Sequence, residues 1–351
     1  RDLIARRLRR DVRANDHLGF VGDDAYVVLL SLDTGEAEAY PAAQRLVCAA
    51  TAAAGAPANA GVATCPDDGD EAEALIEKAG AAAVAAAAAG DAQPSWYRES
   101  DGRAYARRAS IRDQLRDGDP GALLEARFQP ILDANNGSLF GASAAASWRR
   151  VDPETAGSSP QAWLSAEPDR RVVENLELWM IARAAEAYDG SGSAPDLPVF
   201  ISLESRSDAA VDAIARGFAD RPGTRSVYVE LVGRLQPEPP EIESFVRRLR
   251  SIGAAVGVGA WRTASAPFDG ANGLLDFVTV DAGSDVRTLA GLAVASVIAP
   301  IVVAGGARDR DHARWLLRNG ATAVRGDGIA PPMAWNELVR WASNHSGTVA
   351  Q

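Results

Sequence analysis

The sequence predicts an α/β protein in two parts, a small N-terminal α/β unit followed by a barrel of the (β/α)8 type. Short apolar, β-branched segments recur after residue 120, and helical stretches separate most of them. A charged stretch ending in the turn-forming DGDPG divides the two parts. We assign residues 1–100 to the first unit, 101–120 to a charged helical linker and 121–345 to the barrel.

The first hundred residues alternate between helical and extended patterns. An arginine-rich helix opens the chain, and an alanine-rich helix ends at Gly90, because glycine is a common helix stop. The predicted elements are a helix at 1–14, a strand pair around 25–32, a helix at 42–54, a strand at 61–66, a helix at 70–90 and a strand at 96–99.

The second part contains eight predicted strands. Their apolar residues are not confined to alternate positions, which is typical of parallel strands covered by helices on the outside. Eight such strands predict a closed barrel, in which function gathers at the carboxyl ends of the strands. The segments are RFQPILDA (127–134), SLFGASAA (138–145), PVFISLE (198–204), SVYVELV (226–232), AAVGVGA (254–260), FVTVDA (277–282), PIVVAGG (300–306) and ATAVRGD (321–327).

Charge and composition narrow the classes of partner. Thirty-six basic against 47 acidic side chains give a net charge of −11. This charge repels nucleic acid and anionic membranes in bulk, although a local basic patch could still bind a phosphate. No stretch is long and apolar enough to predict a membrane span or a signal peptide, so we expect a cytoplasmic protein. Because the chain begins at Arg1, we interpret it as part of a longer protein and leave upstream sensory or membrane segments open.

Cysteines and histidines predict no metal site. Cys48 and Cys65 are too few for a disulfide framework or a four-ligand site, and we predict two buried free thiols in a reducing compartment. The three histidines lie far apart in the sequence without ligand spacing.

The predicted strand ends hold few chemically reactive groups. In order they are Ser143, Ser202, Glu230, Gly259 with Ala260, Asp281, Gly305 and Arg325. Metal-assisted phosphodiester hydrolysis uses two divalent ions about 3.5–4 Å apart, held by several hard oxygen ligands. Two carboxylates are too few for that, and no histidine or lysine stands at these ends as a general base. Glu230 and Asp281 are either hydrogen-bonded residues of the barrel mouth or weak ligands of one hydrated ion.

Several of these motifs, in this order, resemble the tandem GGDEF–EAL proteins of bacterial cyclic-di-GMP signalling. The resemblance spans the chain and implies the C-terminal half of a GGDEF-like α/β sandwich over about 1–100, followed by an EAL-like barrel over about 108–345. It is carried by Gln129-Pro130-Ile131, Trp148, the helix NLELWMI, Glu230 in VELV, Asp281 in VTVD, VVAGG and GVATCPDDGD.

The chain departs from the EAL pattern at the positions that the resemblance makes catalytic. GASAAASW at 141–148 stands where the family has G-F-E-A-L-L-R-W, so Ser143 replaces a metal-binding glutamate and Ser147 a nucleotide-contacting arginine. Six further positions differ: Ser202 for an asparagine ligand, Gly259 and Ala260 for paired aspartates, Thr279 for a lysine, Gly305 for a glutamate and Arg325 for a glutamine. The resemblance therefore implies a barrel without phosphodiesterase activity.

The first unit departs from its pattern in a similar way. GDDAY at 22–26 lies over GGDEF, with Asp23 in place of the second glycine and Ala25 in place of a metal-binding glutamate. Val84 and Ala87 replace a tyrosine and a phosphate-binding lysine. The earlier half of such a domain is not part of the chain, so we expect no cyclase activity.

One motif favours nucleotide binding. Arg13-Ala-Asn-Asp16 matches the R-x-x-D inhibitory-site pattern of the family and precedes GDDAY by its usual five residues. A guanidinium and a nearby carboxylate suit a phosphate and a guanine edge. The alternative is an arginine-rich helix ending in a polar cap, in which such a pattern arises by chance.

Three functional hypotheses follow. The first is a catalytically inactive regulatory module that acts through contacts with an unidentified protein, with a homodimer as one possibility. The second is a cyclic-di-GMP receptor without hydrolysis, and the third is a weak residual phosphodiesterase. We expect no metal or other cofactor, no nucleic-acid partner and no membrane insertion. The residues assigned to possible nucleotide binding are Arg13, Asp16, Gln129, Pro130, Glu230 and Asp281.

Overall fold

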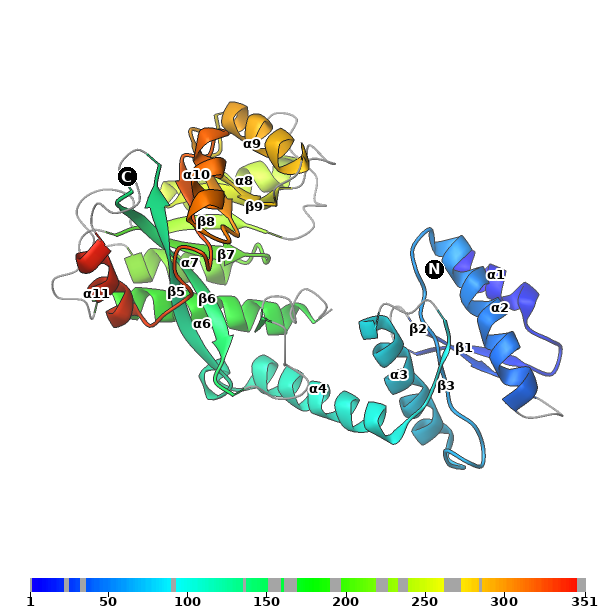
Figure 1. Cartoon of the computed structure of the whole chain (residues 1–351). Coiled ribbons are helices and arrows are strands. Elements are labelled where there is room, and N and C mark those ends of the chain that lie inside the picture. Colours follow the sequence, from blue (N-terminus) through cyan, green and yellow to red (C-terminus); the bar gives the residue numbers. More distant parts are fainter. Residues whose placement is uncertain are drawn as a thin grey trace. The chain divides into compact units, whose positions relative to one another are not determined.

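The computed structural model divides the chain into two compact units, Arg1–Arg112 and Asp113–Gln351 (Figure 1). Each unit has its own helices and strands and is described by itself. The structure describes residues 2–21, 25–31, 36–89, 93–134, 137–150, 159–160, 169–189, 197–218, 227–232, 239–261, 273–283 and 286–345.

Among its described residues, the first unit has two separate two-stranded sheets, three complete helices and the first part of a fourth. In chain order its elements are α1 (Asp2–Asp11), β1 (His17–Val21), β2 (Ala25–Leu29), α2 (Glu36–Ala54), β3 (Gly61–Val62), α3 (Ala72–Ala89) and β4 (Ser95–Trp96). Strands β1 and β2 pair antiparallel, whereas β3 and β4 pair parallel. The predicted GGDEF-like sandwich therefore stays a prediction.

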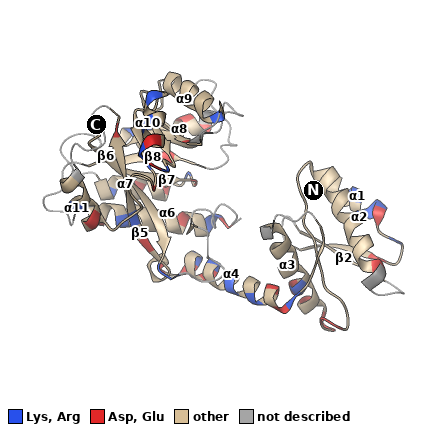
Figure 2. Ribbon diagram, viewed as in Figure 1, with Lys and Arg blue, Asp and Glu red and all other residues tan. Residues whose placement is uncertain are grey.

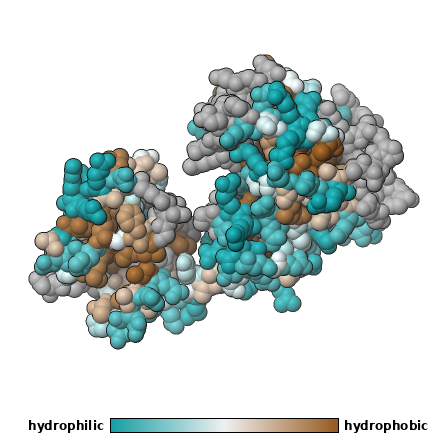
Figure 3. All heavy atoms as spheres, turned by 180° about the vertical axis from the view of Figure 1, so that it is seen from behind, coloured by the Kyte–Doolittle hydropathy of each residue, from teal (hydrophilic) through white to brown (hydrophobic). Residues whose placement is uncertain are grey.

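Small residues set the packing of this unit. A Cβ atom at Gly61 would lie 1.9 Å from the backbone oxygen of Ala79, so glycine lets β3 approach α3 directly. Figure 3 shows hydrophobic areas on the surface of the unit, whose helices α2 and α3 are rich in alanine. The prediction of buried thiols was wrong, because Cys48 and Cys65 are both exposed. Cys48 lies on the exposed side of α2, and Cys65 lies in the loop that follows β3.

The predicted linker forms a helix, α4 (Glu99–Asp117), and the division between the two units falls inside it. A short 3-10 helix, η1 (Pro120–Ala122), follows. Its first turn is capped by Asp119, whose carboxylate accepts a hydrogen bond of 2.8 Å from the backbone N–H of Gly121.

The eight strands predicted in the second unit form a closed barrel. They are β5 (Leu124–Asp133), β6 (Leu139–Trp148), β7 (Val199–Leu203), β8 (Val227–Leu231), β9 (Ala255–Trp261), β10 (Phe277–Asp281), β11 (Ile301–Gly305) and β12 (Ala323–Val324). Around the barrel the order is β10-β11-β12-β5-β6-β7-β8-β9. The predicted parallel sheet is confirmed for most neighbouring strands, but β5 runs antiparallel to both β6 and β12. Only five residues, 134–138, connect β5 to β6, which fits a hairpin rather than a crossover.

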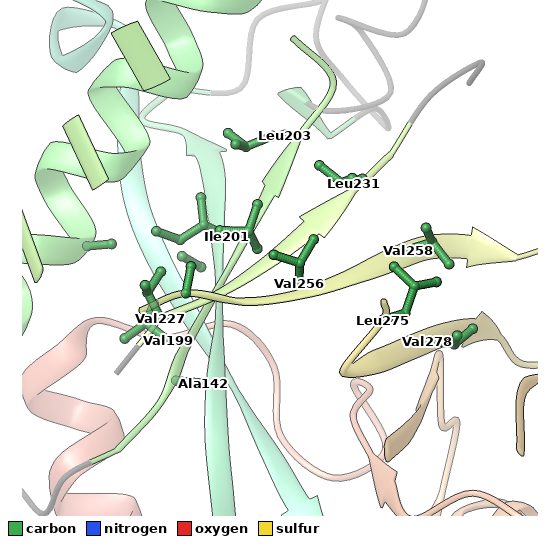
Figure 4. Close-up of a cluster of buried hydrophobic side chains, with 14 of the residues drawn as sticks. Ala142, Val199, Ile201, Leu203, Val227, Leu231, Val256, Val258, Leu275 and Val278 are labelled. Atoms are coloured by element: carbon green, nitrogen blue, oxygen red, sulfur yellow. The ribbon is translucent and has the colours of Figure 1, made fainter. Parts of the chain in front are cut away.

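Helices cover the outside of the barrel (Figure 1). They are α6 (Arg170–Asp189), α7 (Asp208–Phe218), α8 (Pro239–Ser251), α9 (Val286–Ile298), α10 (Arg310–Arg318) and α11 (Trp335–His345). Outward-facing strand residues pack under them in one large apolar cluster, part of which is drawn in Figure 4. Among the described residues, no helix is long and apolar enough to cross a bilayer.

A second apolar cluster fills the inside of the barrel. Phe200 of β7 lies 5.1 Å from Phe277 of β10 between ring centroids and 4.5 Å from Tyr228 of β8. Strands β7 and β10 are not neighbours in the barrel, so these rings meet across its interior. Ile131, Val303 and Ala323 complete this cluster. We call this inner cluster the barrel floor, because the polar side chains further along the strands lie between it and the mouth of the barrel.

Candidate functional site

Strand periodicity brings several predicted site residues of the second unit to one mouth of the barrel. Side chains alternate between the two faces of a strand, so Ser202 follows Phe200, and Glu230 follows Tyr228, on the inner face. The same spacing places Asp281 beyond Phe277 and Arg325 beyond Ala323. The structure therefore collects at one mouth groups that are up to 182 residues apart in sequence.

Glu230 lies at the centre of this mouth. Its side chain is only 3% exposed, and its Oε2 atom accepts a hydrogen bond of 3.0 Å from Ser202 Oγ. Arg325 Nη2 lies 3.5 Å from the same oxygen, and Arg325 Nη1 donates to Ser143 Oγ. A buried carboxylate is costly unless it is paired and hydrogen-bonded, and here a guanidinium and a hydroxyl do both.

Two glycines leave room around this pair. A Cβ atom at Gly259 would lie 2.5 Å from Glu230 Oε1 and 2.6 Å from its Cγ, so the Glu230 side chain occupies the space of a side chain at 259. A Cβ atom at Gly305 would lie 3.5 Å from Arg325 Nε and 3.9 Å from Asp281 Oδ1. Asp281, which is exposed, and Arg325 thus border the same open position.

Gln129 joins the rim of the mouth from β5. It pairs with Ser143 in the register of β5 and β6, and neighbouring Pro130 is buried. Gln129 Nε2 donates to Asp327 Oδ1 at 3.0 Å and to the backbone oxygen of Ala330 at 3.1 Å. Its amide therefore holds the segment after β12, an interaction that the sequence did not predict.

Arg13 and Asp16 belong to the first unit, and each has partners there. Asp16 accepts hydrogen bonds from the backbone N–H of Arg13 at 2.7 Å and of Ser31 at 3.1 Å. Arg13 Nη1 lies 3.3 Å from Glu38 Oε2, with 58% of the Arg13 side chain exposed. Asp16 therefore stabilises the turn after α1, as the polar-cap interpretation expects, and nucleotide binding by Arg13 stays a prediction.

Ala25, the predicted replacement of a metal ligand in the first unit, opens β2 in an exposed position. Residues 22–24 of the GDDAY motif lie outside the described residues. In the barrel, the backbone of Ala260 belongs to β9, and its side chain lies outside the description.

The described residues of the mouth do not fit a pair of divalent metal ions. Among the described residues, no group of three or more histidine, cysteine, aspartate or glutamate side chains could hold a metal. The carboxylate that could lead such a site, Glu230, already faces the Arg325 guanidinium. A fixed positive charge beside the carboxylate opposes a cation, because like charges repel strongly where water is excluded.

Two polar side chains near the mouth are buried, which the sequence did not predict. Glu177, within NLELWMI on α6, accepts hydrogen bonds from the backbone N–H groups of Glu204 and Ser205 and from Ser205 Oγ, just after β7. Burial raises the pKa of Glu177, and these hydrogen bonds oppose the rise in part. Thr279 is fully buried, and its hydroxyl has no partner among the described residues. The charge of Glu177 within an apolar helix pattern was the available signal for its burial, whereas Thr279 was named only as the position where the resemblance expects a lysine.

No protein-family model matches the sequence, and no curated protein is significantly similar to it. Solved structures do match. An EAL enzyme, Bd1971, in a form bound to cAMP and cyclic-di-GMP, aligns with a TM-score of 0.57 at 17% identity, over 70% of this chain and 72% of that chain.

Two further structures have the same kind of domain. The phosphodiesterase PaMucR in complex with cyclic-di-GMP aligns with a TM-score of 0.53 at 17% identity, over 65% of this chain and 99% of that chain. The Bacillus subtilis protein YkuI, with an EAL domain bound to cyclic-di-GMP and calcium, gives 0.54 at 13%, over 69% and 62%. At these identities the likeness concerns the fold.

Proposed function

From the EAL-domain fold of the barrel, we propose that this protein is a module of cyclic-di-GMP signalling that does not hydrolyse the nucleotide and acts through contacts with other proteins. The observation that carries the proposal is the ion pair between Glu230 and Arg325 at the barrel mouth. We further propose that the first unit is a degenerate GGDEF-like domain without cyclase activity.

The argument against hydrolysis is electrostatic. Phosphodiester cleavage assisted by metals needs cations that polarise the phosphate and generate hydroxide. At this mouth a guanidinium stands beside the buried carboxylate, and Ser143, Gly259 and Gly305 contribute no carboxylate. Arginine does not release its proton in proteins, so Arg325 cannot replace a general base.

The exposed side of α9 supports a role in protein contacts. Val286 and Val297 are 80% and 81% exposed, and Leu289 and Val294 are also exposed. Together these four side chains form what we call the α9 face. Exposed apolar residues grouped on one surface are typical of interaction sites. A second copy of the chain is the partner proposed for this face.

A metal-independent receptor is the second candidate. The exposed carboxylate of Asp281 and the rim position of Gln129 leave polar groups at the mouth for a ligand, and Arg325 supplies a positive charge. PaMucR and YkuI were each solved with cyclic-di-GMP bound. Against this candidate, Arg325 is already engaged by Glu230 and Ser143.

Isothermal titration with cyclic-di-GMP, with magnesium or with EDTA, tests both candidates. We expect no turnover in a parallel hydrolysis assay and no binding heat in either buffer. Micromolar binding in EDTA would instead favour the receptor, and Arg13→Ala and Gln129→Ala would then tell the two units apart. Magnesium-dependent turnover that Glu230→Ala abolishes would contradict the proposal.

A further inference from the structure

At the barrel mouth, the positive charge beside Glu230 is supplied by a side chain of the protein, the guanidinium of Arg325. We infer that the Arg325 guanidinium takes the place of a bound metal cation beside Glu230, and that a variant without this guanidinium has a latent site for a divalent cation. This inference deepens the proposed metal-free mouth and does not depend on whether a nucleotide binds.

Arg325 has two side-chain partners at the mouth and lies beside the position at Gly305. Nη2 lies 3.5 Å from Glu230 Oε2, and Nη1 donates to Ser143 Oγ. Nε lies next to the open position at Gly305, which Asp281 Oδ1 also borders. The guanidinium thus has one carboxylate and one hydroxyl as partners, with Asp281 on the other side of the position at Gly305, and the Arg325 side chain is only 17% exposed.

The same groups would suit a hard cation if the guanidinium were removed. Carboxylate, hydroxyl and water oxygens are the ligands that Mg²⁺, Mn²⁺ and Ca²⁺ prefer. Ser202 Oγ, at 3.0 Å from Glu230 Oε2, adds one more oxygen. Glu230, Ser143 and Ser202 would supply only part of a coordination shell, so the remaining ligands would be water and the affinity modest.

Removing Arg325 also leaves the buried charge of Glu230 uncompensated, so a bound cation would stabilise the folded state. Breaking a buried ion pair leaves the partner charge uncompensated, which destabilises the folded state strongly. Glu230 would keep only Ser202 as a partner among the described contacts. A cation that binds the folded state and not the unfolded state would recover part of the loss.

Gly259 is part of the same arrangement. Glu230 reaches its present position only because no Cβ atom stands at 259, where one would lie 2.5 Å from Oε1. Gly259 therefore leaves the space that the Glu230 side chain occupies, and Arg325 compensates the negative charge of Glu230.

The test compares melting temperatures of the full chain without nucleotide, in EDTA and in millimolar Mn²⁺, Mg²⁺ or Ca²⁺. The unchanged protein should show no response of the barrel transition to any of the three ions. Arg325→Ala should melt lower in EDTA and regain roughly 3 °C or more in the best ion, as expected at about ten times the dissociation constant. Titration of Mn²⁺ by electron paramagnetic resonance should show one bound ion in Arg325→Ala.

Three variants serve as controls. Arg318→Ala, at the exposed end of α10, removes a guanidinium away from the mouth and should show no ion response. Arg325→Lys keeps the charge and should show none. The double variant Arg325→Ala with Glu230→Gln removes both charges and should fold in EDTA without responding to ions.

The inference is overturned if the unchanged protein binds an ion at this mouth, or if folded Arg325→Ala binds none. Arg325→Gln fills more of the space and replaces Arg325→Ala if the alanine variant does not fold. If neither single variant folds with any ion present while the double variant does, no latent site exists. Because no nucleotide is used, these outcomes are independent of the titration that tests the proposed function.

Discussion

The buried carboxylate of Glu177 links helix α6 to the turn after β7, close to the mouth. Burial raises its pKa, so the folded protein holds the proton more tightly than the unfolded chain does. The contribution of Glu177 to stability is therefore greatest below the ordinary glutamate pKa of about 4.3 and declines as the pH rises through the window up to the raised value.

Glu177→Gln should remove this decline. Glutamine keeps an acceptor oxygen for the N–H groups of Glu204 and Ser205 and stays neutral, so the two proteins should differ by about 1 kcal/mol or less at low pH. Urea unfolding between pH 4.5 and 7.5 measures the difference, and the wild-type protein should lose stability relative to the variant as the pH rises. A constant difference, or one of opposite sign, would contradict the raised pKa.

At the site, the sequence predicts the positions of single residues but not the contacts between their side chains. Positions such as Ser143, Gly259 and Glu230 could be assigned to strand ends from local patterns and from the family resemblance. The contact of Arg325 with Glu230 could not be predicted, because it joins residues 95 apart across a closed barrel. Its geometry depends on side-chain rotamers and on a missing Cβ atom.

Among the elements, β10 lies directly against Gly257 of β9, with which Phe277 is paired in the register. A Cβ atom at Gly257 would lie 2.3 Å from the backbone oxygen of Phe277 and 2.5 Å from its ring. Gly257→Ala should therefore lower the free energy of unfolding by about 1–3 kcal/mol, the usual cost of overpacking. Gly80→Ala, on α3 with nothing within 4 Å of its added Cβ, is the matched control in thermal unfolding followed by circular dichroism. Equal effects of the two changes would show that the barrel floor yields to the extra atom.

The direction and register of the strands could not be predicted from the sequence, for a related reason. All eight barrel strands were predicted where they occur, because short apolar runs between turns are a local signal. The antiparallel direction of β5 and the irregular pairing of β9 with β10 near Val280 were not predicted. Direction and register arise from contacts between strands, which no single segment contains.

At the scale of the whole molecule, a net charge of −11 opposes self-association except where acidic residues are absent. The helix of the α9 face carries one charged residue, Arg287, and no acidic one, and Figure 2 draws it mostly in tan. We therefore predict a dimer through this face that forms at high concentration. Replacing both Val294 and Val297 by lysine should give a monomer with an unchanged circular dichroism spectrum, because the two side chains face outward.

Light scattering after size exclusion, over a range of protein concentrations, measures this change in mass. Arg318→Ala, on α10, is the control and should dimerise like the unchanged protein. A monomer at all concentrations before any substitution would contradict the prediction, and the α9 face would then belong to a different partner.

The space that Gly259 leaves for Glu230 also restricts the routes by which such a mouth can change during evolution. A side chain gained at 259 alone would force Glu230 out of its contacts with Ser202 and Arg325, since its Cβ would stand 2.5 Å from Oε1. If Arg325 were exchanged first, Glu230 would be free to turn away, and the same gain would meet less resistance. The effect of one substitution thus depends on which came before it, so a change of Arg325 followed by a gain at 259 would be tolerated far more readily than the reverse order.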